Sequence, residues 1–329
     1  MTLQTPPKPT ETLTQPPPTA AATGAAMTWT QRKYRGAGEV SRAQKIIAYA
    51  ILLAGSIVLL VPFYFVVNGS LKTDAEVQAG DFVTPARDVA GQTIITEEGP
   101  VRVGGIHNYP RALSPRYMNF FPALANTVVI TTLSVIGQIL SCSLVGYGFA
   151  RFSFRGRNIL FIVMLSTMML PAQVTMIPVF VLFRWLGMID TFWPLIVPMW
   201  LASPFFVFMF RQFFAQIPED LMEAARIDGA SNWTIYWRLM MPLCGPVIAI
   251  VSIYTFLTAW NDFMGPLIYL NSPENRTLAL ALAAFRGQYG MSDAHLLMAA
   301  SVVCMVPCVI LFFAAQKYFV ESIAMTGLK

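Results

Sequence analysis

Long stretches without a charged side chain recur along the chain, and six of them are 20 to 34 residues long. They cover residues 46–71, 117–150, 158–183, 191–210, 239–261 and 294–316. A helix needs about 20 apolar residues to cross a bilayer core roughly 30 Å thick, so each run is long enough. The pattern predicts an all-α polytopic membrane protein whose six transmembrane helices lie at about 46–68, 121–148, 158–183, 191–213, 244–270 and 294–318.

Composition excludes an ordinary soluble domain. Of the 329 residues 56% are hydrophobic and only 12% are charged, whereas roughly a quarter of the residues of soluble proteins are charged. The chain carries 22 Lys and Arg against 17 Asp and Glu, for a net charge of +5. Basic residues beside helix ends explain this excess better than a nucleic-acid partner does.

A seventh uncharged run, residues 12–31, is of a different kind. It contains Pro16, Pro17 and Pro18 among many small polar residues and has few large apolar side chains. Proline removes backbone donors, and low hydrophobicity leaves little to offset the ordering entropy. Residues 1–45 are therefore predicted to be a disordered, basic N-terminal tail. No apolar segment typical of a secretory signal follows its first charges.

The distribution of Lys and Arg predicts the orientation in the membrane, because cytoplasmic loops carry an excess of both. Basic residues precede the first run, and Arg151, Arg155 and Arg157 separate the second from the third without any acid. Between the third and fourth runs stand only Arg184 and Asp190. Both termini, including the tail 321–329, and the connections after helices two and four are thus predicted to be cytoplasmic.

Catalytic and metal-binding chemistry is scarce in the apolar runs. No GxxxxGK[ST] phosphate loop occurs, so ATP binding by that motif is not expected. Cys304 and Cys308 share a helix face, but no His or acid stands beside them, so packing is favoured over a metal site. Asp262 is an ionisable residue well inside an apolar region, and it should face protein, water or a cavity. We expect neither an enzyme nor a directly bound cofactor.

Residues 216–243, predicted to be a cytoplasmic loop, contain the most informative motif. Pro218 suits the first position of a short helix, and Gly229 can end that helix because it tolerates positive φ. Ser231 can cap a second helix, which Pro242 should end. The pattern predicts a bent helix pair that projects from the membrane and inserts into a partner.

Small and polar residues of this loop could face that partner. Leu221, Ala224 and Ala225 are predicted to share one face and to permit close approach, while Glu223 and Asp228 offer polar anchors. Alternatively, Glu223 is a surface residue that complements the helix dipole.

The loop resembles the cytoplasmic signature of permease subunits of bacterial binding-protein-dependent ABC importers. That signature reads Glu-Ala-Ala, three residues, Gly, nine residues, Ile, one residue, Leu-Pro. The residues that match are Glu223, Ala224, Ala225, Gly229 and Pro242, while Leu239 and Met241 replace the Ile and the Leu. Further segments over residues 45–329 are similar to the carbohydrate-importing, maltose-type permeases: 63–72, 108–113, 228–231, 260–263 with 266–267, and 318–320.

This resemblance implies half of a translocation pathway in a bacterial inner membrane. A homologous permease would supply the other half, two ATP-binding subunits would bind ATP and Mg²⁺, and an external binding protein would deliver the solute. The implied ATPase-coupling residues are Glu223, Ala224, Ala225, Asp228, Gly229 and Pro242. Trp260, Asn261 and Asp262 could line the solute path or fix helix packing. A stand-alone secondary transporter or channel is the alternative.

The external segment 72–116 is longer than a simple connector. Two β-prone runs, 93–96 and 101–103, flank a Glu-Gly-Pro turn and predict a hairpin within an insertion at 91–104. The insertion could contact the binding protein or the partner permease, or it could be a tolerated loop. The resemblance also suggests that the C-terminal tail 321–329 can reach the interface of the ATPase dimer.

Overall fold

The computed structural model describes residues 41–86, 91–96, 99–289 and 293–326. Most of the predicted disordered tail and the last residues of the C-terminal tail lie outside this range. The chain divides into two units, Met1–Val61 and Pro62–Lys329. In the first unit, the described residues form most of helix α2 (Arg42–Ser70), and all of their side chains are exposed. That exposure suits a helix surrounded by lipid.

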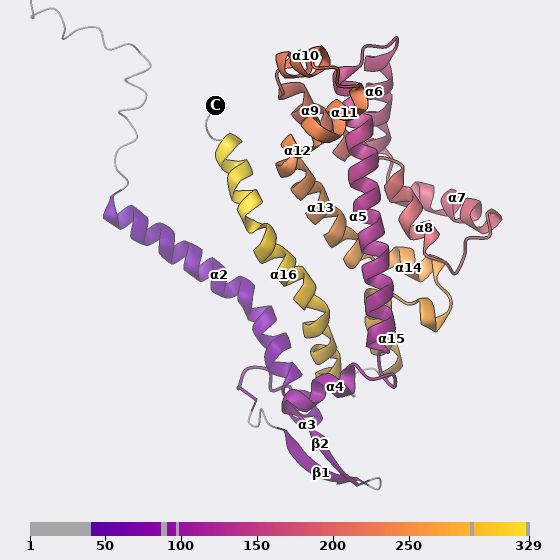
Figure 1. The fold of residues 1–329 in the computed structure, drawn as a ribbon. Helices are drawn as coiled ribbons and strands as arrows, with labels where there is room; N and C mark the ends of the chain where they lie inside the picture. Colours follow the sequence, from indigo (N-terminus) through magenta and orange to yellow (C-terminus); the bar gives the residue numbers. More distant parts are fainter. Residues whose placement is uncertain (1–40, 87–90, 97–98, 290–292, 327–329) are drawn as a thin grey trace, which may run out of the picture. The chain divides into compact units, whose positions relative to one another are not determined.

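Among the described residues, four helical segments are long and apolar enough to cross a membrane (Figure 1). They are α2, α5 (Phe120–Arg151), the segment Trp193–Gln216 and α16 (Ala294–Thr326), of which Ala294–Gln316 forms the apolar part. Two further pairs of helical segments qualify only if each pair is counted as one span, which gives up to six. They are Arg157–Met169 with Ala172–Trp185 and Asn232–Leu243 with Gly245–Trp260. The nearly all-helical fold agrees with the sequence.

The predicted continuous helix 158–183 is wrong, because the chain bends sharply in its middle. α6 (Arg157–Ser166) and a 3₁₀ turn, η2 (Thr167–Met169), lead to α7 (Ala172–Trp185) at an angle of 98°. Pro171 causes the break: it has no N–H to donate, and it forces Leu170 into an extended conformation.

The predicted helices 191–213 and 244–270 are also interrupted. The first consists of α8 (Trp193–Ile196), η3 (Val197–Trp200) and, after Ala202 at a φ of 59°, α9 (Pro204–Gln216). The second consists of α13 (Gly245–Trp260) and, after a short break, α14 (Met264–Tyr269). After the turn η5 (Pro273–Asn275), the chain forms α15 (Leu278–Tyr289), which was not predicted from the sequence.

The hairpin expected between residues 93 and 103 is present. β1 (Gln92–Thr96) pairs antiparallel with β2 (Gly99–Val103), in a register that sets Gln92 opposite Val103. β2 begins at Gly99, which the sequence had assigned to the turn. The neighbouring elements are the short helices α3 (Asp74–Gln78), η1 (Gly105–His107) and α4 (Asn108–Ala112).

Buried polar groups attach this segment to the end of α2 within the second unit. Lys72 is fully buried, and its Nζ lies 3.3 Å from a carboxylate oxygen of Asp81. Asn108 donates from Nδ2 to the carbonyl oxygens of Ser70 and Lys72 at 2.9 and 2.8 Å. Burying a Lys costs free energy unless its charge is paired, so Asp81 makes this arrangement tolerable.

Helix α5 packs closely on α9 because one glycine allows it. A Cβ on Gly146 would lie 2.7 Å from the Cβ of Phe210 and 3.2 Å from the carbonyl oxygen of Val207. Further along α5, the Trp200 indole lies over Gly137 and donates from Nε1 to the Leu133 carbonyl oxygen at 3.1 Å. α5 thereby becomes the helix against which η3 and α9 are packed.

A polar knot centred on Asp190 joins the connection after α7 to the segment before α15. Asp190 has a φ of 62°, and its Oδ1 accepts hydrogen bonds from the N–H groups of Asn271 and Ser272 at 2.9 and 3.0 Å. The Ser272 hydroxyl also donates to Asp190. These bonds, first the Ser272 hydroxyl and then the backbone donors and Asn275, lower the pKa of the Asp190 carboxyl.

Replacing Gly146 by Ala should destabilise the protein by about 1–3 kcal/mol, because overpacking pushes α5 from α9. The matched control is Gly148→Ala, since a Cβ there meets nothing within 4 Å. That control should be neutral or about 0.5–1 kcal/mol more stable. Unfolding free energies in detergent measure both, and equal values for the two variants would contradict the close approach.

The Asp190 knot should make stability depend on acidity. The folded-state pKa lies below the unfolded value of about 3.9, so the stabilisation is complete above that value and is lost as the pH falls through the folded-state pKa. The thermal midpoint of Asp190→Asn should therefore lie below that of the wild type at pH 6, and the gap should close in acid. A gap that does not change with pH would exclude this origin.

Candidate functional site

The loop between α9 and α13 folds as the predicted bent helix pair. α10 (Glu219–Ile227) begins directly after Pro218, which occupies the N-cap position and so lies one position earlier than predicted. Glu219 and Asp220 occupy the first turn, where negative charge complements the helix dipole.

Gly229 ends α10 as expected, with a φ of 83°. The N–H of Gly229 donates to the carbonyl oxygen of Arg226 at 3.0 Å, and that of Ala230 donates to Ala225 at 2.9 Å. These two bonds form a Schellman motif, in which a residue with positive φ lets the last carbonyl groups of a helix be satisfied. Gly229 therefore sets the angle at which the chain leaves α10.

The second helix begins at the predicted cap. Ser231 Oγ accepts a hydrogen bond from the Thr234 N–H at 3.2 Å, and α11 (Asn232–Ile235) follows. The prediction that Pro242 ends this helix is wrong, because a π-helical turn, η4 (Tyr236–Met240), leads into α12 (Met241–Leu243), which contains it. The chain turns only at Cys244, where the segment Asn232–Leu243 meets α13 at an angle of 77°.

One face of the helix pair is open and the other is buried. Glu223, Ala224, Asp228, Gly229 and Pro242 are all exposed, whereas Ala225 is half-buried. The open surface also carries large apolar side chains, namely Leu221, Ile227 and Trp233, which are 47%, 87% and 59% exposed. Such apolar groups among charges are typical of a protein-binding surface.

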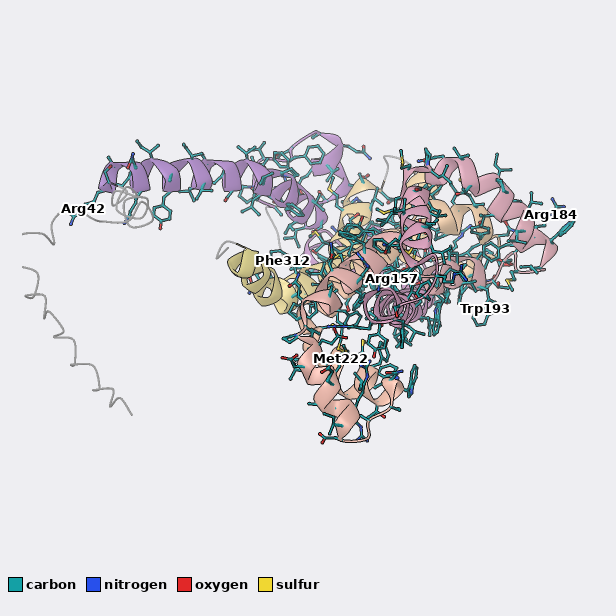
Figure 2. The ribbon with its side chains drawn as sticks, turned by 90° about the horizontal axis from the view of Figure 1, so that it is seen from above. Arg42, Arg157, Arg184, Trp193, Met222 and Phe312 are labelled. Atoms are coloured by element: carbon teal, nitrogen blue, oxygen red, sulfur yellow. The ribbon has the colours of Figure 1, made fainter. Side chains whose placement is uncertain are left out.

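The buried face is carried by residues that the sequence did not single out. Met222, Ile235, Tyr236 and Met240 are each at most 1% exposed and pack in one cluster with residues of α5, α9 and α13. Met222 is labelled in Figure 2, where the helix pair joins the rest of the unit. Recognising Met222 would have required knowing which face of α10 packs on the rest of the unit.

The second candidate region, Trp260 to Asp262, divides between packing and an open cavity. Trp260 is 5% exposed, stacks on Phe256 at 5.2 Å and donates from Nε1 to the Cys304 carbonyl oxygen at 3.2 Å. Asp262 Oδ1 accepts from the Gly265 N–H at 3.1 Å, at the start of α14. Both side chains thus contribute to helix packing, and a role in the solute path stays a prediction.

Asn261 differs from its neighbours because its side chain is exposed. Together with Trp260 it lines a cavity of about 310 Å³. The cavity lies between α13, α15 and α16, and Ser301, Cys304 and Cys308 also line it. Asn261 Nδ2 donates to the Leu257 carbonyl oxygen at 2.8 Å, which orients the amide. Of the three candidates for the solute path, Asn261 is the most exposed, Asp262 is half-buried, and Trp260 lines the same cavity as Asn261.

The family follows from comparison with known proteins. The family model "Binding-protein-dependent transport system inner membrane component" matches residues 142–325, more than half of the chain. The chain belongs to this family of ABC importer permeases, as the loop motif indicated. It is a multi-pass inner-membrane transport subunit, and ATP hydrolysis in such systems is carried out by a separate subunit.

Individual relatives agree with this assignment. The arabinooligosaccharides transport system permease protein AraQ of Halalkalibacterium halodurans is 38% identical over 62% of this chain and 72% of its own length. The diacetylchitobiose uptake system permease protein NgcG of Streptomyces coelicolor is 28% identical over 88% and 91%. A solved bacterial ABC transporter involved in alginate import shares the fold, with a TM-score of 0.69, 24% identity and coverage of 85% and 98%.

The division between Trp260 and Asn261 predicts unequal effects of truncation. Trp260→Ala should lower the unfolding free energy by about 3–5 kcal/mol, because a buried aromatic ring and its hydrogen bond are lost. Asn261→Ala should stay within about 0.5 kcal/mol, as expected of an exposed residue. Unfolding in detergent measures both variants, and a small loss for Trp260→Ala would refute its packing role.

Proposed function

We propose that this chain is one of two membrane-spanning subunits of an ATP-driven importer and that its bent helix pair docks on an ATPase subunit. The observation that carries the proposal is the open face of α10 and its turn. Exposed apolar and charged residues project there on a rigid support, beside the matching Glu223, Ala224, Ala225 and Gly229. Asp228 and Pro242 complete the proposed coupling set.

We infer that the chain crosses the membrane six times, with α6, η2 and α7 together as one span and α13 as another, and that both termini are cytoplasmic. The helix pair lies at the same end of α5 as the connection to α6, which contains Arg155 and ends at Arg157, the first residue of α6 (Figure 1). Because basic loops stay inside, this neighbourhood supports a cytoplasmic helix pair.

In the proposed mechanism, ATP and Mg²⁺ bind to the two ATPase subunits and not to this chain. Closure of the ATPase dimer moves the docked helix pairs, and the two permeases switch from inward-facing to outward-facing. ATP can shift this equilibrium only by its differential affinity for the two states. Glu223 acts as an interface anchor here and not as a proton donor.

The proposed solute is a sugar, delivered by an external binding protein. The names of the relatives, which refer to arabinooligosaccharides and diacetylchitobiose, support a di- or oligosaccharide. Asn261 is the candidate for a direct contact, since an amide can both donate to and accept from hydroxyl groups. The hairpin formed by β1 and β2 is a candidate contact for the binding protein, and the tail 321–329 for the ATPase interface.

The alternative left open by the sequence is a stand-alone secondary transporter or channel, which membership in this family does not favour. In such a protein the exposed apolar residues of the helix pair would need another explanation, because exposing them to water is unfavourable. The same argument favours a partner protein on this face.

Gly229→Val should weaken docking of the ATPase by about five- to thirtyfold, because a β-branched residue at positive φ costs about 1–2 kcal/mol and reshapes the turn. Gly229→Asn is the matched control, since Asn tolerates this conformation. Co-purification of the ATPase subunit and solute uptake measure the effect in membranes that contain equal amounts of each variant. Wild-type uptake by Gly229→Val would refute the docking assignment.

A further inference from the structure

Arg151, the last residue of α5, reaches across to the chain that enters the helix pair. Its Nη2 donates to the carbonyl oxygens of Phe214 and Ile217, the latter at 2.5 Å. These carbonyl groups close α9, and α10 begins two residues after Ile217. Because the carboxyl end of a helix carries partial negative charge, a guanidinium is well suited to hold it.

The exit from the helix pair is tied to the same part of α5. The Tyr236 hydroxyl lies 2.7 Å from the Ser143 hydroxyl, and both groups are buried. The Tyr147 ring lies between the two connections, 5.3 Å from Tyr236 and 5.8 Å from Phe214. The last turns of α5 therefore contact both connections of the helix pair, the one that enters α10 and the one that leaves α11.

The other end of α5 is also anchored by polar groups. Thr127 Oγ1 accepts a hydrogen bond from the Leu278 N–H at 2.8 Å, and Asn126 donates from Nδ2 to the Glu274 carbonyl oxygen at 2.7 Å. The segment 274–278 adjoins the Asp190 knot through Asn275. α5 has 32 residues without a break, which corresponds to a length of about 48 Å. Figure 1 shows it running between these two ends.

We propose that Arg151 is a positioning residue for energy coupling: it makes α5 follow the entry to α10, so that displacement of the helix pair reaches the Asp190 knot. The inference rests on the proposed docking of an ATPase at this pair. Tyr236 and Ser143 form a second link in the same connection. A residue that only stabilised α9 would affect assembly and unfolding but not the amount of solute moved per ATP.

The test uses the complete importer in proteoliposomes, with the solute, binding protein and ATPase subunits. For Arg151→Gln, the ratio of solute transported to ATP hydrolysed should fall about two- to thirtyfold, the range typical of residues that modulate coupling. The amount of co-purified ATPase should stay near that of the wild type, whereas the thermal midpoint should fall because two hydrogen bonds from a charged donor are lost. The matched control is Arg155→Gln, which removes the same charge from an exposed position four residues away and should leave the ratio unchanged.

Two further variants keep the test valid if Arg151→Gln folds poorly. Arg151→Lys keeps the charge and should give a smaller loss, whereas Tyr236→Phe keeps the ring and removes the hydroxyl link. Because both links serve one connection, the loss in Arg151→Lys/Tyr236→Phe should differ from the product of the single losses. Normal transport per ATP in all of these variants would overturn the inference. If the wild-type chain itself neither assembles with the ATPase nor transports, the proposed function fails instead.

Discussion

The burial of Met222 and Tyr236 in the cluster shared with α5, α9 and α13 is the contact on which the site depends. α10 has nine residues and α11 four, and helices this short are not stable alone in water. The cluster that Met222 joins provides the missing stability, and the Tyr236 hydroxyl adds a hydrogen bond to Ser143. As one face is held in this way, the other can present Leu221 and Ile227 to a partner.

At breaks in the spanning segments, polar side chains pair with backbone groups that the helices leave free. In a bilayer an unpaired backbone group is costly, so non-helical backbone is tolerated where protein surrounds it or water reaches it. At Asp262 a carboxylate accepts the Gly265 N–H, and at Asp190 a carboxylate binds the segment that follows α14. The chain has few carboxylates, and two of them, Asp190 and Asp262, lie where helices end.

Local chemistry could be predicted from the sequence, whereas contacts between distant segments could not. Gly229 and Ser231 act through their own backbone neighbourhood, so turn and cap rules were sufficient for them. The uncharged runs were sufficient to locate α2, α5 and α16. They do not show whether a helix is unbroken, so the break at Pro171 was not predicted within a uniformly apolar run. Met222 and Arg151 depend on which helices meet, and a single sequence does not contain that information.

We propose that this chain transports solute only as part of an ATP-driven assembly. The most direct measurement is uptake of a radiolabelled oligosaccharide into proteoliposomes, by the chain alone and together with a partner permease, ATPase subunits and a binding protein. We expect no flux for the chain alone, and we expect uptake by the assembly only when ATP is present. Flux through the isolated chain, driven by a solute or ion gradient and indifferent to ATP, would contradict it.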